Sequence, residues 1–218
     1  MREAYFMVRA VVEAPLQQKF DQWYSSHHLP MALAEFKAKK AWRFWSTVDR
    51  NVHYAVYQFA NEARLKLAMK DEILKPLIAD FDKSWPSGVT RARDLLNLVE
   101  ERSGGAQVED EDGATAKAYL MVRAVVEEPL RQKFDRWYSS DHLPKDVVTF
   151  RAEKAWRFWS TTDAAVHYAV YRFADQSKLD AAMKGEVLKP LIADFDQAWP
   201  SGVTRSRDLL TLAEAKDG

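Results

Sequence analysis

The stretch Tyr5-Phe-Met-Val-Arg-Ala-Val-Val-Glu13 returns 114 residues later as Tyr119-Leu-Met-Val-Arg-Ala-Val-Val-Glu127. The same offset then continues without a gap, and 67 of 96 positions are identical when residues 5–100 are aligned with residues 119–214. An ungapped match of this length predicts that both segments have the same fold. We therefore predict two domains of one kind, over residues 1–100 and 118–218.

The segment between the copies, residues 101–117, has a different composition. It contains three of the seven glycines, an acidic run and almost no large apolar residue. Such a composition is typical of flexible chain. We predict a flexible acidic linker here.

Composition excludes several classes of protein. Of 218 residues, 47% are hydrophobic, and the 32 basic residues balance the 32 acidic ones, so the basic excess of a nucleic-acid-binding protein is missing. No apolar run approaches the length of a membrane span, and the N-terminal residues lack the pattern of a signal peptide. We expect neither nucleic acid nor a membrane as a partner.

The chain has no cysteine, which removes disulfides, thiolate metal sites and cysteine nucleophiles. Absence of cysteine fits a reducing compartment, and we expect the cytoplasm. The sequence also lacks a glycine-rich phosphate loop, metal-ligand spacing and a nucleophile-elbow pattern. We therefore expect no metal and no cofactor.

The pattern of apolar and turn residues predicts the order β-α-β-β-α-β in each copy. In the first copy we expect strands over 5–13, 41–47, 52–59 and 89–99. Pro15 begins a helix that should end near residue 26, because Pro30 disfavours helical geometry at the residue before it. Asn61 caps a second helix through residue 69, and Pro76 separates it from a further helical segment.

This order is that of the ferredoxin-like fold, an antiparallel sheet with both helices on one face. Phe6, Val8, Ala10 and Val12 alternate along the first strand and suit the helix-covered face. We place Arg9, Trp45, His53, Tyr57 and Arg91 on the opposite face, which is large, aromatic and cationic. A surface of that kind needs a partner sheet. We predict that the two repeats pair sheet-to-sheet within one chain, as an intramolecular pseudo-dimeric α+β barrel, with further homo-oligomerisation open.

The segments Phe20-Asp-Gln-Trp-Tyr-Ser-Ser-His-His-Leu-Pro30 and Phe134-Asp-Arg-Trp-Tyr-Ser-Ser-Asp-His-Leu-Pro144 carry an aromatic-rich helix that ends in His-x-Pro. In this the chain resembles the EthD-like members of the dimeric α+β barrel superfamily, here as a fused tandem repeat. The usual unit of that family is a single repeat that forms a homodimer. The resemblance implies proton-transfer chemistry without a cofactor, of the cyclase, isomerase, decarboxylase or cofactor-free oxygenase type.

His28 and His142 are the candidate catalytic residues. Imidazole titrates near neutral pH and exchanges protons with a bound substrate. The alternative is that each histidine caps the carbonyl groups at the end of its helix. The family resemblance favours catalysis or ligand contact.

Ten further residues are candidates for substrate binding. Arginines within strands require an anionic partner, which is either a carboxylate of the protein or a ligand oxyanion. Aromatic residues in the same strands offer flat walls to a ring, although at this spacing they are commonly plain core. These residues are Arg9, Arg123, Arg91, Arg205, Trp45, Trp159, Tyr57, Tyr171, His53 and His167.

Two functions remain open. The first is a cofactor-independent enzyme acting on a small aromatic or polyketide-like carbonyl compound. The second is a non-catalytic or stress-related barrel protein that binds a small hydrophobic or aromatic ligand. Haem binding occurs in some barrel relatives through a histidine ligand, and here His53 or His167 could be proposed for it, but nothing else in the sequence argues for haem.

Overall fold

The computed structural model of the chain describes residues 2–104 and 117–218. It divides into two compact units. The first comprises Met1–Asn97 with Leu212–Gly218, and the second comprises Leu98–Thr211. The two halves of the repeat therefore correspond to the two units, except for the ends of two strands.

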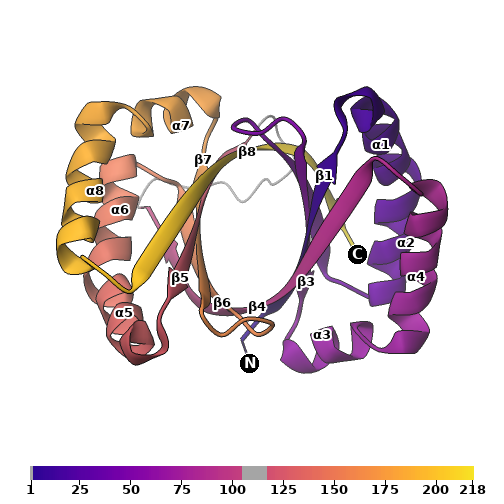
Figure 1. Cartoon of the computed structure of the whole chain (residues 1–218), viewed down its shortest axis with the longest axis horizontal. Coiled ribbons are helices and arrows are strands. Elements are labelled where there is room, and N and C mark those ends of the chain that lie inside the picture. The colour runs from indigo at the N-terminus through magenta and orange to yellow at the C-terminus, as the bar shows by residue number, and fades with distance from the viewer. Residues whose placement is uncertain (1, 105–116) are drawn as a thin grey trace. The chain divides into compact units, whose positions relative to one another are not determined.

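The first repeat contains ten elements (Figure 1). They are β1 (Ala4–Val12), the 3₁₀ turn η1 (Ala14–Leu16), α1 (Gln17–Trp23), the π-helical turn η2 (Tyr24–His28), α2 (Leu29–Phe36), β2 (Lys40–Ser46), β3 (Val52–Phe59), α3 (Glu62–Ala68), α4 (Asp71–Ser84) and β4 (Val89–Ser103).

The second repeat has the same ten elements in the same order. They are β5 (Ala118–Val126), η3 (Glu128–Leu130), α5 (Arg131–Trp137), η4 (Tyr138–His142), α6 (Leu143–Phe150), β6 (Lys154–Ser160), β7 (Val166–Phe173), α7 (Gln176–Ala182), α8 (Gly185–Ala198) and β8 (Val203–Asp217).

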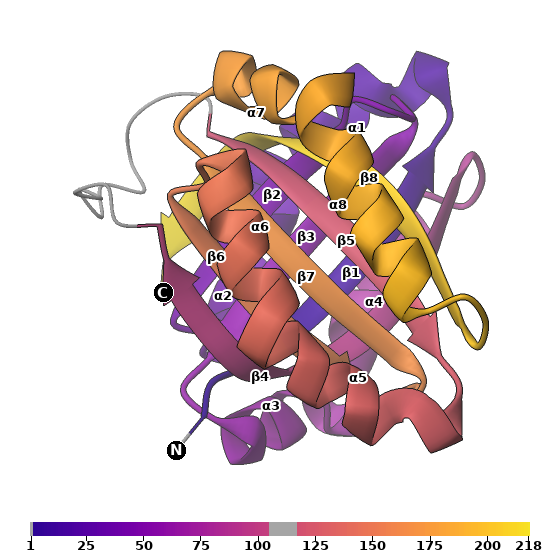
Figure 2. The same cartoon turned by 90° about the vertical axis from the view of Figure 1, so that its left-hand side faces the viewer.

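Each unit has one antiparallel sheet with helices on one face. In the first unit β1 pairs with β3 and β4, and β2 pairs with β3, and the second unit repeats these pairings. Figure 1 shows α1, α2 and α4 beside the strands of the first unit, and Figure 2 shows α5, α6 and α8 across those of the second. The strand order is closed as β1-β3-β2-β8-β5-β7-β6-β4, which confirms the predicted α+β barrel.

The strands β4 and β8 are longer than predicted, with 15 residues each. The last part of β4, from Leu98, belongs to the second unit, and the last part of β8, from Leu212, belongs to the first. Residues 101–103, which we had placed in the linker, are therefore strand. Most of the predicted linker, residues 105–116, lies outside the described residues.

The strand register corrects the predicted division of the sheet into two faces. Phe6 is paired with Tyr57, and Ala10 with His53, so these four side chains lie on the same face. Tyr57 belongs to the core under the helices together with Phe6. Arg9 points to the other face and is exposed. Alternation within a strand was predicted correctly, but the register between strands was not.

The first long helix does not end near residue 26 as expected. It widens into the π-helical turn η2 and continues as α2 through Pro30, which is the second residue of α2. Proline is tolerated there because the first N–H groups of a helix need no partner within it. His28 therefore lies at the junction of η2 and α2, inside a helical layer and not in a loop.

Pro76 does not separate the next two helices. The break is at Lys70, which has extended backbone, and Pro76 lies within α4. The predicted cap is present, since the Asn61 side chain accepts a hydrogen bond from the N–H of Arg64. None of the helices in the described part of the chain is both long and apolar enough to span a membrane.

Candidate functional site

A pocket lies within the first unit, between the helices and the sheet. The turn η2, helices α2 and α4 and strands β1, β3 and β4 supply its walls. The cavity volume is about 40 Å³. The residues that line it are Phe6, Val8, Tyr24, His28, Phe36, Tyr57, Leu74, Leu77, Ile78, Phe81, Arg91 and Arg93. A water needs about 10–15 Å³ by this measure, so the cavity holds a few waters or a small polar group.

His28 is held on the wall of this pocket by aromatic rings. Its imidazole stacks on Trp23, with ring centroids 4.7 Å apart, and meets the edges of Tyr24 and Phe81. Nδ1 lies 3.5 Å from Oδ2 of Asp80, within ion-pair range but without hydrogen-bond geometry. The Nδ1 edge of the ring thus faces a carboxylate and leaves Nε2 on the other edge.

The environment of His28 keeps it neutral. Burial lowers its pKa to about 4, and the charge of Arg91 acts in the same direction, while Asp80 opposes the shift. Neutral imidazole has a free lone pair, so His28 can act as a base at pH 7. The alternative role, a cap for carbonyl groups at a helix end, does not apply because helix continues on both sides of His28.

Two arginines of β4 line the pocket opposite the histidine. The guanidinium of Arg91 lies over the ring of Phe81, 3.9 Å from its centroid, and donates to Asp82 at 2.6 Å. Arg93 is exposed. Two cations beside an apolar cavity can stabilise an oxyanion within it.

A pair of tyrosines completes the polar groups of the pocket. The hydroxyls of Tyr24 and Tyr57 lie 3.3 Å apart, and both side chains are buried. Burial raises the pKa of Tyr57 well above its ordinary value. The hydroxyl therefore stays protonated and is available as a hydrogen-bond donor.

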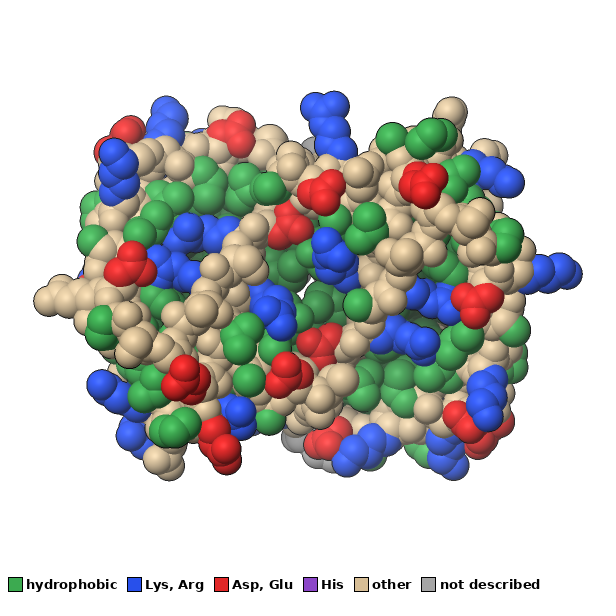
Figure 3. Space-filling model, in the orientation of Figure 1, with side chains coloured by type: hydrophobic (Ala, Val, Ile, Leu, Met, Phe, Trp, Pro, Cys, Tyr) green, Lys and Arg blue, Asp and Glu red, His purple; other side chains and the backbone are tan. Residues whose placement is uncertain are grey.

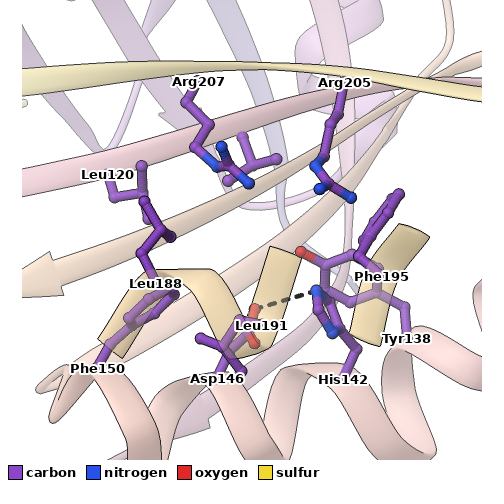
Figure 4. Close-up of a pocket in the computed structure, with 11 residues that line it drawn as sticks. Leu120, Tyr138, His142, Asp146, Phe150, Leu188, Leu191, Phe195, Arg205 and Arg207 are labelled. Carbon is purple, nitrogen blue, oxygen red and sulfur yellow. Dashed lines mark ion pairs between the residues drawn. The ribbon is translucent and has the colours of Figure 1, made fainter. Parts of the chain in front are cut away.

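The second unit has the equivalent pocket, with one added group (Figure 4). His142 stacks on Trp137 at 4.4 Å, and Arg205 and Arg207 reach toward the cavity from β8. Asp146 of α6 occupies the position of Ala32 in the first unit. Its Oδ2 lies 3.3 Å from His142 Nε2 and accepts a hydrogen bond from Tyr171 at 2.6 Å. The volume of this cavity is only about 20 Å³.

His142 is neutral for the same reason as His28. Burial lowers its pKa to about 3, and Arg205 and Lys145 act in the same direction. Burial also raises the pKa of Asp146 to about 7. The second pocket therefore contains a neutral imidazole beside a carboxyl group that is close to its midpoint of titration at neutral pH.

The structure brings six of the twelve predicted site residues into the pockets or beside them. His28, Tyr57 and Arg91 line the first pocket, and His142 and Arg205 line the second. Tyr171 donates to Asp146 beside the second pocket. Two further residues, Trp45 and Trp159, pack on the helix-covered core but line neither pocket.

Four predicted residues lie elsewhere. Arg9 and Arg123 are on the face away from the helices, so neither lines the pocket of its unit. His53 and His167 are fully buried under α1 and α5, against Phe20 and Phe134 respectively. Nε2 of each histidine accepts a hydrogen bond from a buried arginine. They do not fit a haem ligand, because the ring nitrogen that would bind iron is already paired and enclosed.

Sequence reasoning overlooked these buried arginines, Arg43 and Arg157. Arg43 donates to His53 and Asp21, and to Glu214 at 3.1 Å. The signal was present in the sequence, since the arginine stands between two aromatic residues in both copies. A charged residue in such a row must be paired when it is buried.

The surface agrees with cationic pockets. Figure 3 shows Lys and Arg side chains set into hollows of apolar surface in each unit. Acidic and basic side chains elsewhere on this face are mixed. Within residues 2–104 and 117–218, no group of three or more His, Asp or Glu side chains could hold a metal ion.

Comparison with solved structures gives matches over the whole chain at low identity. An anthrone oxidase-like protein has a TM-score of 0.67 at 11% identity, covering 100% of this chain and 94% of that one. A candidate monooxygenase from Lactobacillus acidophilus NCFM has a TM-score of 0.62 at 12% identity, covering 100% and 97%. A mutant chlorite dismutase from Candidatus Nitrospira defluvii has a TM-score of 0.59 at 9% identity, covering 97% and 92%.

The chain shares the α+β barrel fold of these structures. At these identities the likeness extends to the fold and not to a reaction. No protein-family model matches the sequence, and no curated protein matches it.

Proposed function

We propose that the chain is an EthD-like α+β barrel enzyme that moves a proton on a small aromatic or polyketide-like carbonyl compound without a cofactor. One observation carries the proposal. Each repeat places a neutral, buried histidine on the wall of a small pocket that is also lined by two arginines and a tyrosine. The His-Leu-Pro segment that resembles the EthD-like family contains this histidine.

The groups in the first pocket suit abstraction of a proton next to a carbonyl. Nε2 of His28 takes the proton, and Asp80 beside Nδ1 stabilises the imidazolium that forms. Negative charge develops on the carbonyl oxygen, where Arg91, Arg93 and the Tyr57 hydroxyl stabilise it. The apolar side chains of α4 exclude water and hold the carbon skeleton.

The fate of the enolate would decide the reaction. Return of the proton to another carbon gives an isomer, attack on a second carbonyl gives a ring, and reaction with O₂ gives an oxygenated product. Anthrone is a suitable probe because its enolate is reached by one deprotonation. With one O₂, anthrone gives anthraquinone and one water, so no cofactor is required. A ring of this size requires the lining side chains to move apart.

The test is turnover by the full chain. Anthrone and smaller aryl ketones are incubated with the protein in D₂O, and loss of the acidic C–H signal and uptake of O₂ are followed. The double variant H28A/H142A should lose this activity, whereas Lys66→Ala, on the surface of α3, should keep it. Equal rates for H28A/H142A and the parent protein contradict the proposal.

A binding protein without turnover is the second candidate, and the small volume of the cavity favours it. In that case a ketone binds in the pocket and is recovered unchanged. Native mass spectrometry followed by analysis of the released compound separates this outcome from catalysis.

A further inference from the structure

The two pockets differ in one polar group. Tyr24, His28 and Arg93 of the first unit return as Tyr138, His142 and Arg207 in the second. Asp146, however, stands where the first unit has Ala32. Both residues are buried, with 3% and 1% of their surface exposed. The substitution therefore places a carboxyl group inside the second pocket, and not on its rim.

Asp146 is bound by the polar groups of its pocket in the manner of a ligand. The Tyr171 hydroxyl donates to Oδ2 at 2.6 Å, and His142 Nε2 lies 3.3 Å from the same oxygen. Tyr138 lies behind Tyr171, with its hydroxyl 3.1 Å away. Figure 4 shows Arg207 and Arg205 on the opposite side of the cavity. Tyr171 and His142 thus contact the carboxyl in the way that they would contact a ligand oxygen, while the two arginines lie across the cavity.

The first pocket has the equivalent tyrosines, histidine and arginines, but it has no carboxyl group at the position of Asp146. Tyr57 has the Tyr24 hydroxyl as a polar neighbour, at 3.3 Å. Ala32 adds only a methyl group at the place of the carboxyl. The cavity volume is about 40 Å³ in the first pocket and about 20 Å³ in the second. The space and the donors for a carboxylate-sized anion are therefore both present in the first unit.

We propose that the first pocket binds the carboxylate or enolate oxygen of a small ligand where Asp146 places its own carboxyl in the second pocket, so that the second is self-occupied. One chain then has one open site, the pocket of His28. Like charge also opposes a second anion beside Asp146 when it is ionised. The inference rests on the proposed function for the identity of the site, but it concerns binding and can be tested without turnover.

Acetate is the probe, because it is the smallest stable carboxylate with an apolar end. Trp23 stacks on His28 and Trp137 on His142, so their indole N–H signals report on the first and second pockets respectively. With eight tryptophans, the ¹⁵N-indole spectrum of the full chain is simple, and Trp→Phe variants assign these two signals. Titration with acetate at pH 7 is compared with chloride at equal ionic strength.

In the parent protein acetate should shift the Trp23 signal and leave that of Trp137 in place. A32D should weaken acetate binding at the first pocket by about tenfold or more. D146A should make the Trp137 signal respond, while D146N, which keeps the volume filled, should not. The exchange variant A32D/D146A should move the response from Trp23 to Trp137.

An acetate response at both tryptophans of the parent, or at neither, overturns the inference. So does an unchanged second pocket in D146A. If A32D fails to fold, D146A and D146N still decide the matter, because they act on the other unit. Acetate binding as expected without turnover of any ketone leaves this inference standing and contradicts only the proposed enzyme activity.

Discussion

Arg43 donates a hydrogen bond from Nε to His53 Nε2 over 3.2 Å, at a site where both side chains are almost completely enclosed. Arg157 and His167 repeat the bond at 3.2 Å. Each arginine also donates a hydrogen bond to a glutamate at the end of a strand that begins in the other repeat. Arg43 donates to Glu214 of β8, and Arg157 donates to Glu100 of β4. The arginine joins the strand end of β8 or β4 to the core of its unit.

Replacing this arginine should destabilise the chain strongly. The arginine is enclosed but Asp21 is half exposed, so loss of the arginine should cost about 1–3 kcal/mol, chiefly because His53 and Glu214 lose a hydrogen-bond partner. We expect Arg43→Met to lower the free energy of unfolding by that order, measured by urea denaturation. Lys66→Met, which removes an exposed pair with Glu62, should leave the free energy of unfolding almost unchanged. Equal effects would show that the enclosed network contributes no more than a surface pair.

Gly88 should not tolerate a side chain. It has a φ of +74°, and a Cβ there would lie 2.4 Å from Cδ1 of Leu16. A non-glycine residue in this conformation costs about 1–3 kcal/mol, so Gly88→Ala should lower the melting temperature. Gly185→Ala is the matched control. It lies at the start of α8, where the nearest atom to a new Cβ is 3.4 Å away, and should be neutral or stabilising.

Stability should fall as the pH is lowered from 6.5 to about 4. The folded pKa of His28, about 4, lies below the ordinary value of 6.5, so the unfolded chain binds more protons in this window. One pKa unit is about 1.4 kcal/mol, so His28 accounts for roughly 3 kcal/mol at most. His28→Asn should flatten the curve of unfolding free energy against pH. An unchanged slope in this variant would contradict a neutral, buried His28.

Asp146 should have the opposite effect on pH dependence. Its folded pKa, about 7, lies above the ordinary value of 3.8, so the folded chain binds more protons between these values. Stability contributed by the protonated carboxyl is therefore lost as the pH rises from about 4 to 7. Asp146→Asn does not titrate, so its stability relative to the parent should improve across this window. A constant difference between the two proteins from pH 4 to 8 would refute the assignment.

The rate of proton transfer should depend on pH through His28. If the neutral imidazole is the base, kcat/KM should rise through pH 4 and then remain level to pH 8. Asp80 raises the pKa of His28, so Asp80→Asn should move the acid limb to lower pH and reduce kcat/KM. Initial rates across the pH range measure both effects. A limb near pH 6.5 would indicate a solvated base and not His28.

The repeat made much of the fold predictable. The strands, the helix-covered row of Phe6 and Val8 and the cap at Asn61 follow from local patterns that both copies share, even where the residue itself differs, as Asp175 does from Asn61. His28 and Arg91 were predicted as site residues and do line one pocket. Their association in one pocket was not predicted, because Arg91 was assigned to the sheet face away from the helices, whereas its pairing with Ala10 puts it on the helix-covered face.

Other features depend on contacts that local patterns do not report. The face on which Tyr57 lies is set by its pairing with Phe6 across two strands. The helical chain continues past residue 26 through the π-helical turn η2 and into α2. The conformational preferences of single residues do not predict such a turn. The segment after Pro144, which contains Asp146, differs between the copies and was expected at most to alter one entrance; only the structure places Asp146 beside Tyr171 and His142.

The sequence by itself determined that the chain contains two tandem copies of one repeat. It also determined the ferredoxin-like order of strands and helices in each copy, because hydrophobic periodicity and turn residues act locally. Only the tertiary structure decided which side chains face one another. The strand register places the side chains of Tyr57 and His53 on the helix-covered face of the sheet. Burial lowers the pKa of His28 and raises the pKa of Asp146. These are effects of burial and of charges distant in sequence, and they exist only when the chain is folded.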